Sequence, residues 1–326
     1  MSTPVLGVQG GTYPAEGTWS ASFGWRYQKS DRHFVGSEYQ ENRDEEGSQV
    51  INNVNLADLS IRYQATRRVE LSLGMPIFMG TRSQALRAQG ELVERYQTQA
   101  RGIGDIVFSA RRWMFDPDTH ASSNLQLGIG VKLPTGANNV TDTFRVLSGG
   151  VVTNAVRTVD QSIQPGDGGF GILADFTAFK GLATGKLSVY ATGAYLANPQ
   201  GTSGVLTYRG GEGERLMSIA DQYLLRGGVA LPVPRSSNLT FSAGLRVEGV
   251  PTHDLLGPSD NFRRPGVAIS IEPALNIVRG KNGALLSIPF AIYRNRFRSV
   301  WDEVRNGHGD AAFADYLVMA GYSRRF

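Results

Sequence analysis

The chain has 326 residues, of which 41% are hydrophobic, and its mean hydropathy is −0.21. It contains 40 glycines and no cysteine, which excludes disulfides and thiolate metal sites and suits an exported bacterial protein. The net charge is only +4, and no basic cluster is interleaved with aromatic residues, so no nucleic-acid partner is expected. No stretch approaches the roughly 18 consecutive apolar residues of a transmembrane helix.

The N-terminal residues 1–16 are rich in glycine and proline and lack apolar periodicity. We expect an irregular segment there, either in the periplasm or plugging a lumen, and a single barrel domain over residues 17–326. The start Met1-Ser-Thr-Pro4 has neither the basic nor the apolar region of a signal peptide, so we expect such a peptide to have been removed.

The first three predicted strands alternate apolar and polar residues, which is the two-residue period of a β-strand with one apolar face. They cover about 19–28, 52–64 and 68–79. A charged loop over about 30–51 separates the first two, and a tight turn joins the second to the third. A long polar loop is expected over about 80–102.

The next two predicted strands lie within residues 102–136 and show the period most clearly. In the second of them, apolar residues occupy the odd positions from Leu125 to Leu133, and polar residues or glycines occupy the even positions from Asn124 to Lys132. Strands of this length exceed the globular norm of about five or six residues. They suit a tilted membrane-spanning strand of roughly nine to eleven residues.

Seven more strands follow the same period: six start near residues 170, 187, 223, 239, 267 and 286, and the last ends at Phe326. The chain therefore has twelve predicted strands, with five short turns and six long loops in strict alternation. Soluble β-sandwiches and propellers use shorter strands at spacings of about 8–12 residues and do not require loops of alternating length. We predict an all-β fold, a twelve-stranded antiparallel transmembrane β-barrel in the outer-membrane lipid of a Gram-negative bacterium. Its short turns would be periplasmic and its long loops extracellular.

Aromatic side chains near the two rims are expected to form the girdles of such a barrel. Those on the periplasmic side are Trp19, Tyr63, Trp113, Phe115, Phe176, Tyr322 and Phe326. The ending Gly321-Tyr322-Ser-Arg-Arg-Phe326 resembles the C-terminal signal read by the barrel-assembly machinery, which makes that machinery an expected partner. The alternative is a chance terminal phenylalanine.

Three short motifs resemble one known family: Gly102-x-Gly104-Asp105-Ile106, Lys132-Leu-Pro-Thr-Gly136 and Gly166-Asp-Gly-Gly-Phe170. Their order is similar to that of the outer-membrane "transporter" family named for a member in the meta-pathway of phenol degradation. The resemblance covers the middle third of the chain. It implies an outer-membrane barrel that takes up small, often hydrophobic or aromatic molecules, and it brings no catalytic residues.

No arrangement of residues predicts catalysis, a metal site or a cofactor. The four histidines are scattered, and none has a second ligand at the spacing of a helical metal site: His33, His120, His253 and His308. The motifs GxSxG, GxxxxGKS/T and HExxH are absent. A twelve-stranded outer-membrane phospholipase would need a histidine on the outer wall, which the strand pattern does not provide. We expect neither an enzyme nor a cofactor.

The polar positions of the strands predict a charged lumen. The expected pore-lining residues are Arg26, Arg62, Glu70, Asp105, Arg111, Lys132, Asp175, Lys186, Arg226, Arg246, Glu248, Glu272 and Asp315. Seven are basic and six are acidic, so strong selection for anions or cations is not expected. Buried charges must be paired or hydrated. Either these residues brace the wall as a salt-bridged network, or they line a water-filled pore and tune its selectivity.

The long loop over residues 134–167 is the candidate constriction, because its apolar residues Val146, Leu147, Val151 and Val152 are unusual in a loop exposed to water. It would fold inward to narrow the pore, meet a partner, or extend a hairpin above the membrane. We predict a porin-like channel or transporter for the passive passage of a small-molecule solute. The alternative is a structural or interaction barrel with a closed lumen, whose extracellular loops bind a partner; the oligomeric state is left open.

Overall fold

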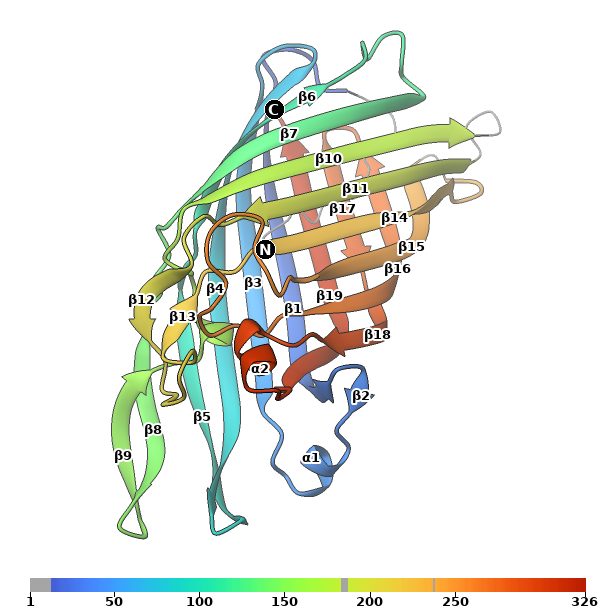
Figure 1. Cartoon of the computed structure of the whole chain (residues 1–326). Helices are drawn as coiled ribbons and strands as arrows, with labels where there is room; N and C mark the ends of the chain where they lie inside the picture. Colours follow the sequence, from blue (N-terminus) through green and yellow to red (C-terminus); the bar gives the residue numbers. More distant parts are fainter. Residues whose placement is uncertain (1–12, 183–186, 237) are drawn as a thin grey trace.

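The strands close into a barrel with long extensions at one end (Figure 1). The computed structural model describes residues 13–182, 187–236 and 238–326. Within these ranges, twelve antiparallel strands form the wall, and pairing of β1 with β19 closes it. The predicted fold class is confirmed.

Two of the twelve wall strands are interrupted, so that β5 with β6 and β17 with β18 each count as one. In chain order the wall consists of β1 (Trp19–Val35), β3 (Ile51–Gln64), β4 (Val69–Ala88), β5 (Glu91–Ile103), β6 (Ile106–Trp113), β7 (Ser123–Leu133), β10 (Gly171–Leu182), β11 (Leu187–Ala197), β14 (Gln222–Pro232), β15 (Leu239–Val250), β16 (Gly266–Arg279), β17 (Asn282–Ser287), β18 (Phe290–Arg296) and β19 (Ala311–Arg325). The loops contain β2 (Glu38–Tyr39), α1 (Asn42–Glu45), β8 (Thr141–Ser148), β9 (Val151–Thr158), the 3-10 helix η1 (Gln161–Ile163), β12 (Thr202–Leu206), β13 (Leu216–Ser218) and α2 (Val300–Val304).

The outer surface of the wall is apolar because the strand period turns one set of side chains outward. Ile129 on β7 pairs with Ala110 on β6 and with Ala174 on β10, and all three lie on this surface. Ile129 is 64% exposed, Phe108 on the adjacent β6 is 46% exposed, and Leu245 on the more distant β15 is 52% exposed. In water such a surface would drive aggregation. In a bilayer it is the apolar band that contacts lipid.

One predicted loop is a β-hairpin instead. Residues 80–102, expected to form a polar loop, continue β4 and begin β5, which pair as far as Ala88 with Glu91. That prediction was wrong because both faces of the hairpin are polar, so no apolar period marks its strands. Gln89 and Gly90 reverse the chain with φ angles of 50° and 91°, the left-handed backbone of a tight hairpin turn.

A second hairpin, β8–β9, projects from the same end of the barrel (Figure 1). It turns at Gly149 and Gly150, whose φ angles are 58° and 81°. Of the three outcomes expected for residues 134–167, this part of the loop matches a hairpin that extends away from the barrel wall.

Helices play only a local part. The segments α1, η1 and α2 are four, three and five residues long. No helix in the described parts of the chain has the length and apolar content needed to cross a membrane.

Tyr13, the first described residue, lies at the periplasmic end of the barrel. Its hydroxyl donates a hydrogen bond to the carbonyl oxygen of His120 (3.1 Å) and accepts one from Nδ2 of Asn124 (3.0 Å). Its ring lies 5.0 Å from that of Trp113. Trp113 shares a strand face with Arg111, so its side chain points toward the lumen. The prediction that Trp113 belongs to the lipid-facing girdle was therefore wrong.

The predicted irregular segment 1–16 lies outside the described residues up to residue 12. Its remaining residues, 13–16, contain no strand or helix.

Candidate functional site

The inner side of the wall gathers the charged residues predicted from the strand period, and most of them are in ion pairs. Lys186 lies outside the described residues. Asp315 is near the extracellular rim, where its carboxylate lies 2.6 Å from Arg294 and 3.1 Å from Arg32. Except for Arg26 and Arg62, the others form two clusters in the wall and one at a break in it.

The first cluster centres on Arg111 of β6. Its Nε donates a hydrogen bond to Asp175 Oδ1 (2.9 Å), and one terminal nitrogen donates to the hydroxyl of Ser72 (3.1 Å). Glu70 lies 3.7 Å from the same guanidinium. The three charged side chains are only 11–15% exposed. One arginine therefore joins β4, β6 and β10 through the interior.

The second cluster consists of charged residues on β14, β15 and β16. Arg226 donates two hydrogen bonds to Glu272, at 2.8 and 2.6 Å, and the hydroxyl of Ser287 donates a third to the same carboxylate (2.8 Å). Arg246 donates two more to Glu248, at 3.0 and 2.7 Å. A two-fold contact between a planar guanidinium and a carboxylate is among the strongest polar contacts in proteins. The Arg226–Glu272 pair links β14 to β16, whereas Arg246 and Glu248 both lie on β15.

Two inner-face cations differ from their neighbours. Arg26 on β1 and Arg62 on β3 form no ion pair within the described residues, and both are only partly buried although the wall surrounds them. Arg26 Nε is itself closed to solvent and has no hydrogen-bond partner, so water can meet only the rest of this guanidinium. Because guanidinium groups stay charged and a charge needs either a partner or water, this part of the interior is suited to holding water.

The three motifs behind the family resemblance meet at one break in the wall. Asp105, between β5 and β6, accepts hydrogen bonds from the backbone N–H groups of Gly136 (2.9 Å) and Asp167 (3.1 Å). Lys132 contacts Asp167 and lies 4.0 Å from Asp105. Both members of the Lys132–Asp105 pair are at least nine-tenths buried. Asp105 and Lys132 therefore hold the two ends of the loop 134–167 to the barrel, a role that sequence spacing alone did not indicate.

The part of this loop that enters the barrel is not the part that contains the four apolar residues of the candidate constriction. The apolar residues Val146, Leu147, Val151 and Val152 lie on the projecting β8–β9 hairpin. The segment just after the hairpin, 159–164, turns inward instead. Val159 and Ile163 are fully buried there and pack against Phe78 on the inner face of β4.

Asp160 fastens this inward segment across the extracellular mouth. Its two oxygens each accept a hydrogen bond from Arg264 at 2.8 Å, and Oδ2 lies 3.6 Å from Arg82 of β4 and 3.2 Å from the Tyr208 hydroxyl. Burial alone would raise the pKa of Asp160, but the charges of Arg264 and Arg82 outweigh burial and hold that pKa well below its usual value. Asp160 is therefore an ionised tie between the wall and the segment that precedes β16.

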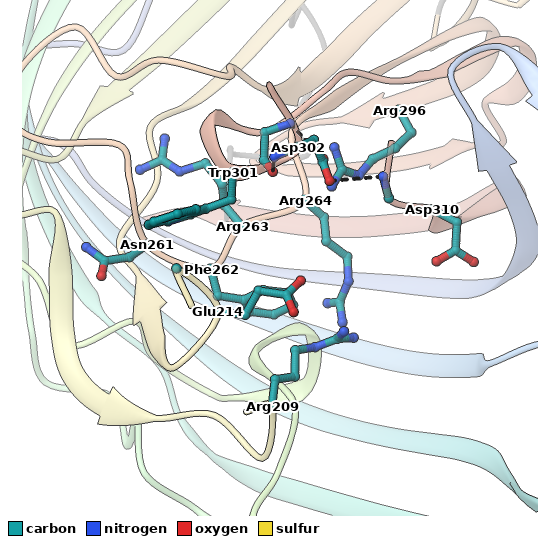
Figure 2. Close-up of a pocket in the computed structure, with 13 residues that line it drawn as sticks. Arg209, Glu214, Asn261, Phe262, Arg263, Arg264, Arg296, Trp301, Asp302 and Asp310 are labelled. Carbon is teal, nitrogen blue, oxygen red and sulfur yellow. Dashed lines mark hydrogen bonds and ion pairs between the residues drawn. The ribbon is translucent and has the colours of Figure 1, made fainter. Parts of the chain in front are cut away.

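Further ion pairs surround a small pocket at this mouth (Figure 2). Arg263 donates two hydrogen bonds to Asp254, at 2.7 and 2.6 Å, and Arg296 donates one to Asp302 at 3.0 Å. Asp302 also closes a capping box with Ser299 at the start of α2. Burial raises the pKa of Asp302, but hydrogen bonds from Ser299 and the charge of Arg296 bring it below its ordinary value. None of these residues was singled out from the sequence, because no period marks a loop.

The predicted assembly signal lies at the seam of the barrel. Gly321 pairs with Gly24 and Tyr322 with Phe23 across the β1–β19 contact. Tyr322 is 46% exposed and Phe326 is 63% exposed. Both aromatic side chains are thus accessible at the outer surface, and recognition by the barrel-assembly machinery stays a prediction.

No metal centre is apparent in the described ranges, where no three His, Asp or Glu side chains come together in a suitable group. His33 is buried in contact with Asp310, and His308 is hydrogen-bonded to the carbonyl of Arg296 (2.7 Å). These histidines have structural partners.

No protein-family model and no curated protein matches the chain. Among solved structures it is similar to an outer-membrane channel from Pseudomonas putida F1, with a TM-score of 0.60 and 13% identity, over 98% of this chain and 99% of that one. The β-domain of the Bordetella autotransporter BrkA gives a TM-score of 0.47 and 9% identity, over 95% and 100% of the two chains. The toluene transporter TbuX of Ralstonia pickettii gives 0.47 and 10%, over 96% and 90%.

At these identities the likeness is one of fold. The closed barrel, its apolar exterior and the match to the P. putida fold place the chain among bacterial outer-membrane proteins, as predicted. Membership of the family named for phenol degradation stays a prediction.

Proposed function

We propose that the protein is a channel for the passive passage of small molecules across the bacterial outer membrane. The observation that carries this proposal is that Arg26 and Arg62 lack an ion-pair partner. Both lie inside the wall, and neither forms an ion pair with a described residue, although Glu248 acts on the charge of Arg26 and Glu70 on that of Arg62 from farther away. Water is the partner that such groups need, and a hydrated interior is what a passive polar channel requires.

The balance of the other charges suggests what such a channel would pass. In both wall clusters each carboxylate lies beside a guanidinium, so the lumen presents local fields of both signs and no dominant one. Strong discrimination between cations and anions is therefore not expected. Hydrophobic or aromatic solutes are suggested by the resemblance to the phenol-degradation family.

A closed barrel that serves as a structural or interaction protein is the second candidate. It is favoured by the inward segment 159–164, which Asp160 ties to both Arg82 and Arg264 across the mouth. On this alternative the projecting hairpins β4–β5 and β8–β9 would bind a partner. The two candidates differ in one measurable property, the passage of ions.

Single-channel recording in planar bilayers separates the candidates. We would compare the wild type with a variant in which residues 160–163 are replaced by Gly-Ser-Gly-Ser. The same replacement at residues 148–151, the tip of the β8–β9 hairpin, is the matched control. The channel proposal expects stable conductance steps that become larger only in the 160–163 variant. Silence in all three proteins, each shown to be folded by its heat-dependent gel mobility, would favour the closed barrel.

A further inference from the structure

The pocket at the extracellular mouth contains one positive charge that no described residue neutralises. The pocket measures about 60 Å³ and lies between the β12–β13 connection, the segment before β16, the end of β18 and α2 (Figure 2). Four arginines line it: Arg209, Arg263, Arg264 and Arg296.

Three of these arginines are in ion pairs, Arg263 with Asp254, Arg264 with Asp160 and Arg296 with Asp302. The other acidic residues of the pocket also have partners. Glu214 lies 3.6 Å from Arg305, and Asp310 contacts both His33 and Arg43. Arg209 forms no ion pair within the described chain, so the charge of its guanidinium is not balanced by a described carboxylate.

Arg209 is held by aromatic rings. Its Cζ lies 4.6 Å from the centre of the Phe262 ring and 5.5 Å from that of Tyr208, and its Nε is buried without a hydrogen-bond partner. Arg264 contacts the same Phe262 ring at 4.8 Å, so two cations share one ring. Cation–π contact offsets only part of the cost of desolvating a permanent charge. The arrangement favours an anion beside Arg209.

The shape of the pocket limits that anion. A volume of about 60 Å³ is several times the roughly 10–15 Å³ that one water needs, which leaves room for a carboxylate group. It does not enclose a benzene ring, which fits a closed cavity of about 150 Å³, so the rest of the ligand would lie at the open edge of the pocket. A planar carboxylate matches the fork of a guanidinium. At the edge of the pocket, Trp301 donates a hydrogen bond to the carbonyl of Asp260 and packs directly on Gly213, which fixes an aromatic wall beside the site.

We propose that this pocket binds the carboxylate of a small aromatic acid, with Arg209 as the ion-pairing residue and Trp301 beside the ring of the ligand. The proposal names a class of solute for the proposed channel and rests on that function for its role in transport. Binding itself is independent of transport and can be measured without it.

Calorimetric titration of benzoate into the purified full-length barrel in detergent tests the proposal. Arg209→Gln should weaken benzoate binding by about tenfold or more, because it removes a charge-assisted contact. Arg157→Gln, which removes an exposed arginine from β9, is the matched control and should leave the affinity unchanged. Benzyl alcohol has the same ring without the charge and should bind much more weakly to the wild type.

Heat-dependent gel mobility shows whether each variant is folded, and Arg209→Lys, which keeps the charge, should recover part of the affinity. Equal benzoate affinity in wild type and Arg209→Gln would overturn the proposal, as would an absence of benzoate binding to the wild type. Phosphate binding as tight as benzoate would overturn the assignment to a carboxylate. Bilayer conductance distinguishes this proposal from the channel proposal. Conductance without benzoate binding would overturn only the proposed binding site. Benzoate binding without conductance would support the binding site and overturn the channel proposal.

Discussion

His33 and Asp310 are joined by a hydrogen bond of 2.6 Å between the ring Nδ1 and the carboxylate Oδ2 at the extracellular end of β1. The second ring nitrogen accepts a hydrogen bond from the backbone N–H of Val50 (2.8 Å). That contact makes Nε2 an acceptor, so Nδ1 carries the proton that is donated to Asp310. Arg43 of α1 contacts the same carboxylate. One imidazole thereby holds two extracellular loops against the barrel.

Replacing His33 by phenylalanine should loosen the loop over residues 36–50. The Val50 N–H would lose its acceptor, and the Asp310 carboxylate would lose a donor. We expect the local free energy of opening to fall by about 1–3 kcal/mol. Hydrogen exchange at the Val50 amide measures it. His120→Phe, on a periplasmic turn, is the control, and equal exchange rates in the two variants would show that the His33 contacts do not hold the loop.

The pH dependence of the mouth should follow Asp160. Its folded-state pKa is depressed, so the ion pair contributes fully above the unfolded value of about 3.9 and is lost as the pH falls toward the lower folded value. We therefore expect protease cleavage within 159–164 to be constant from pH 5 to pH 8 and to increase only in stronger acid. Increased cleavage at pH 6 would contradict this assignment.

Asp160→Asn should loosen the same segment throughout the pH range in which the wild-type Asp160 carboxylate is ionised. Arg82 and Arg264 would keep their charges in a buried site without a carboxylate, which costs about 3–5 kcal/mol. The readout is protease cleavage within 159–164 at pH 7. Asp118→Asn is the control, because its pair with Arg67 is exposed and contributes about 1 kcal/mol or less. If Asp160→Asn resists cleavage as well as Asp118→Asn does, contacts other than those of Asp160 hold segment 159–164 in place.

The barrel wall could be predicted from sequence because lipid imposes a local rule. Each strand must turn apolar side chains outward, so every second residue of a strand such as β7 is apolar. The β4–β5 hairpin beyond the wall escapes this rule, since neither of its faces meets lipid. Its turn at Gln89-Gly90 was the only local signal.

The site could be predicted only in part. The strand period indicated that Arg111 and Asp175 both face inward, but their contact joins positions 64 residues apart and depends on the order of the strands. Asp160 and Arg264 are 104 residues apart and both lie in loops, where no period applies. The one local hint was that Asp160 caps η1 by accepting a hydrogen bond from the Ser162 N–H (3.0 Å).

Breaking the Arg226–Glu272 pair should be costly, and removing both charges should not. Arg226→Met leaves Glu272, which is 1% exposed, without its counter-charge. We expect the free energy of unfolding to fall by about 3–5 kcal/mol. The double variant Arg226→Met/Glu272→Met should recover most of that loss. Urea unfolding in lipid vesicles measures both free energies. If the double variant is no more stable than the single variant, the unpaired charge of Glu272 is not the cause of the loss.

Gly136→Ala should disrupt the junction of the three family-like motifs. An added Cβ would lie 2.8 Å from the carbonyl carbon of Gly104 and 2.8 Å from the Cα of Gly166, and backbone atoms cannot move aside as a flexible side chain can. The hydrogen bond from the Gly136 N–H to Asp105 would be strained as the three segments separate. We expect the free energy of unfolding, measured in urea, to fall by about 1–3 kcal/mol. Gly210→Ala is the control, since its Cβ would meet open space. If the two variants unfold at the same urea concentration, the close contact of these glycines is not what fixes the loop 134–167 to the wall.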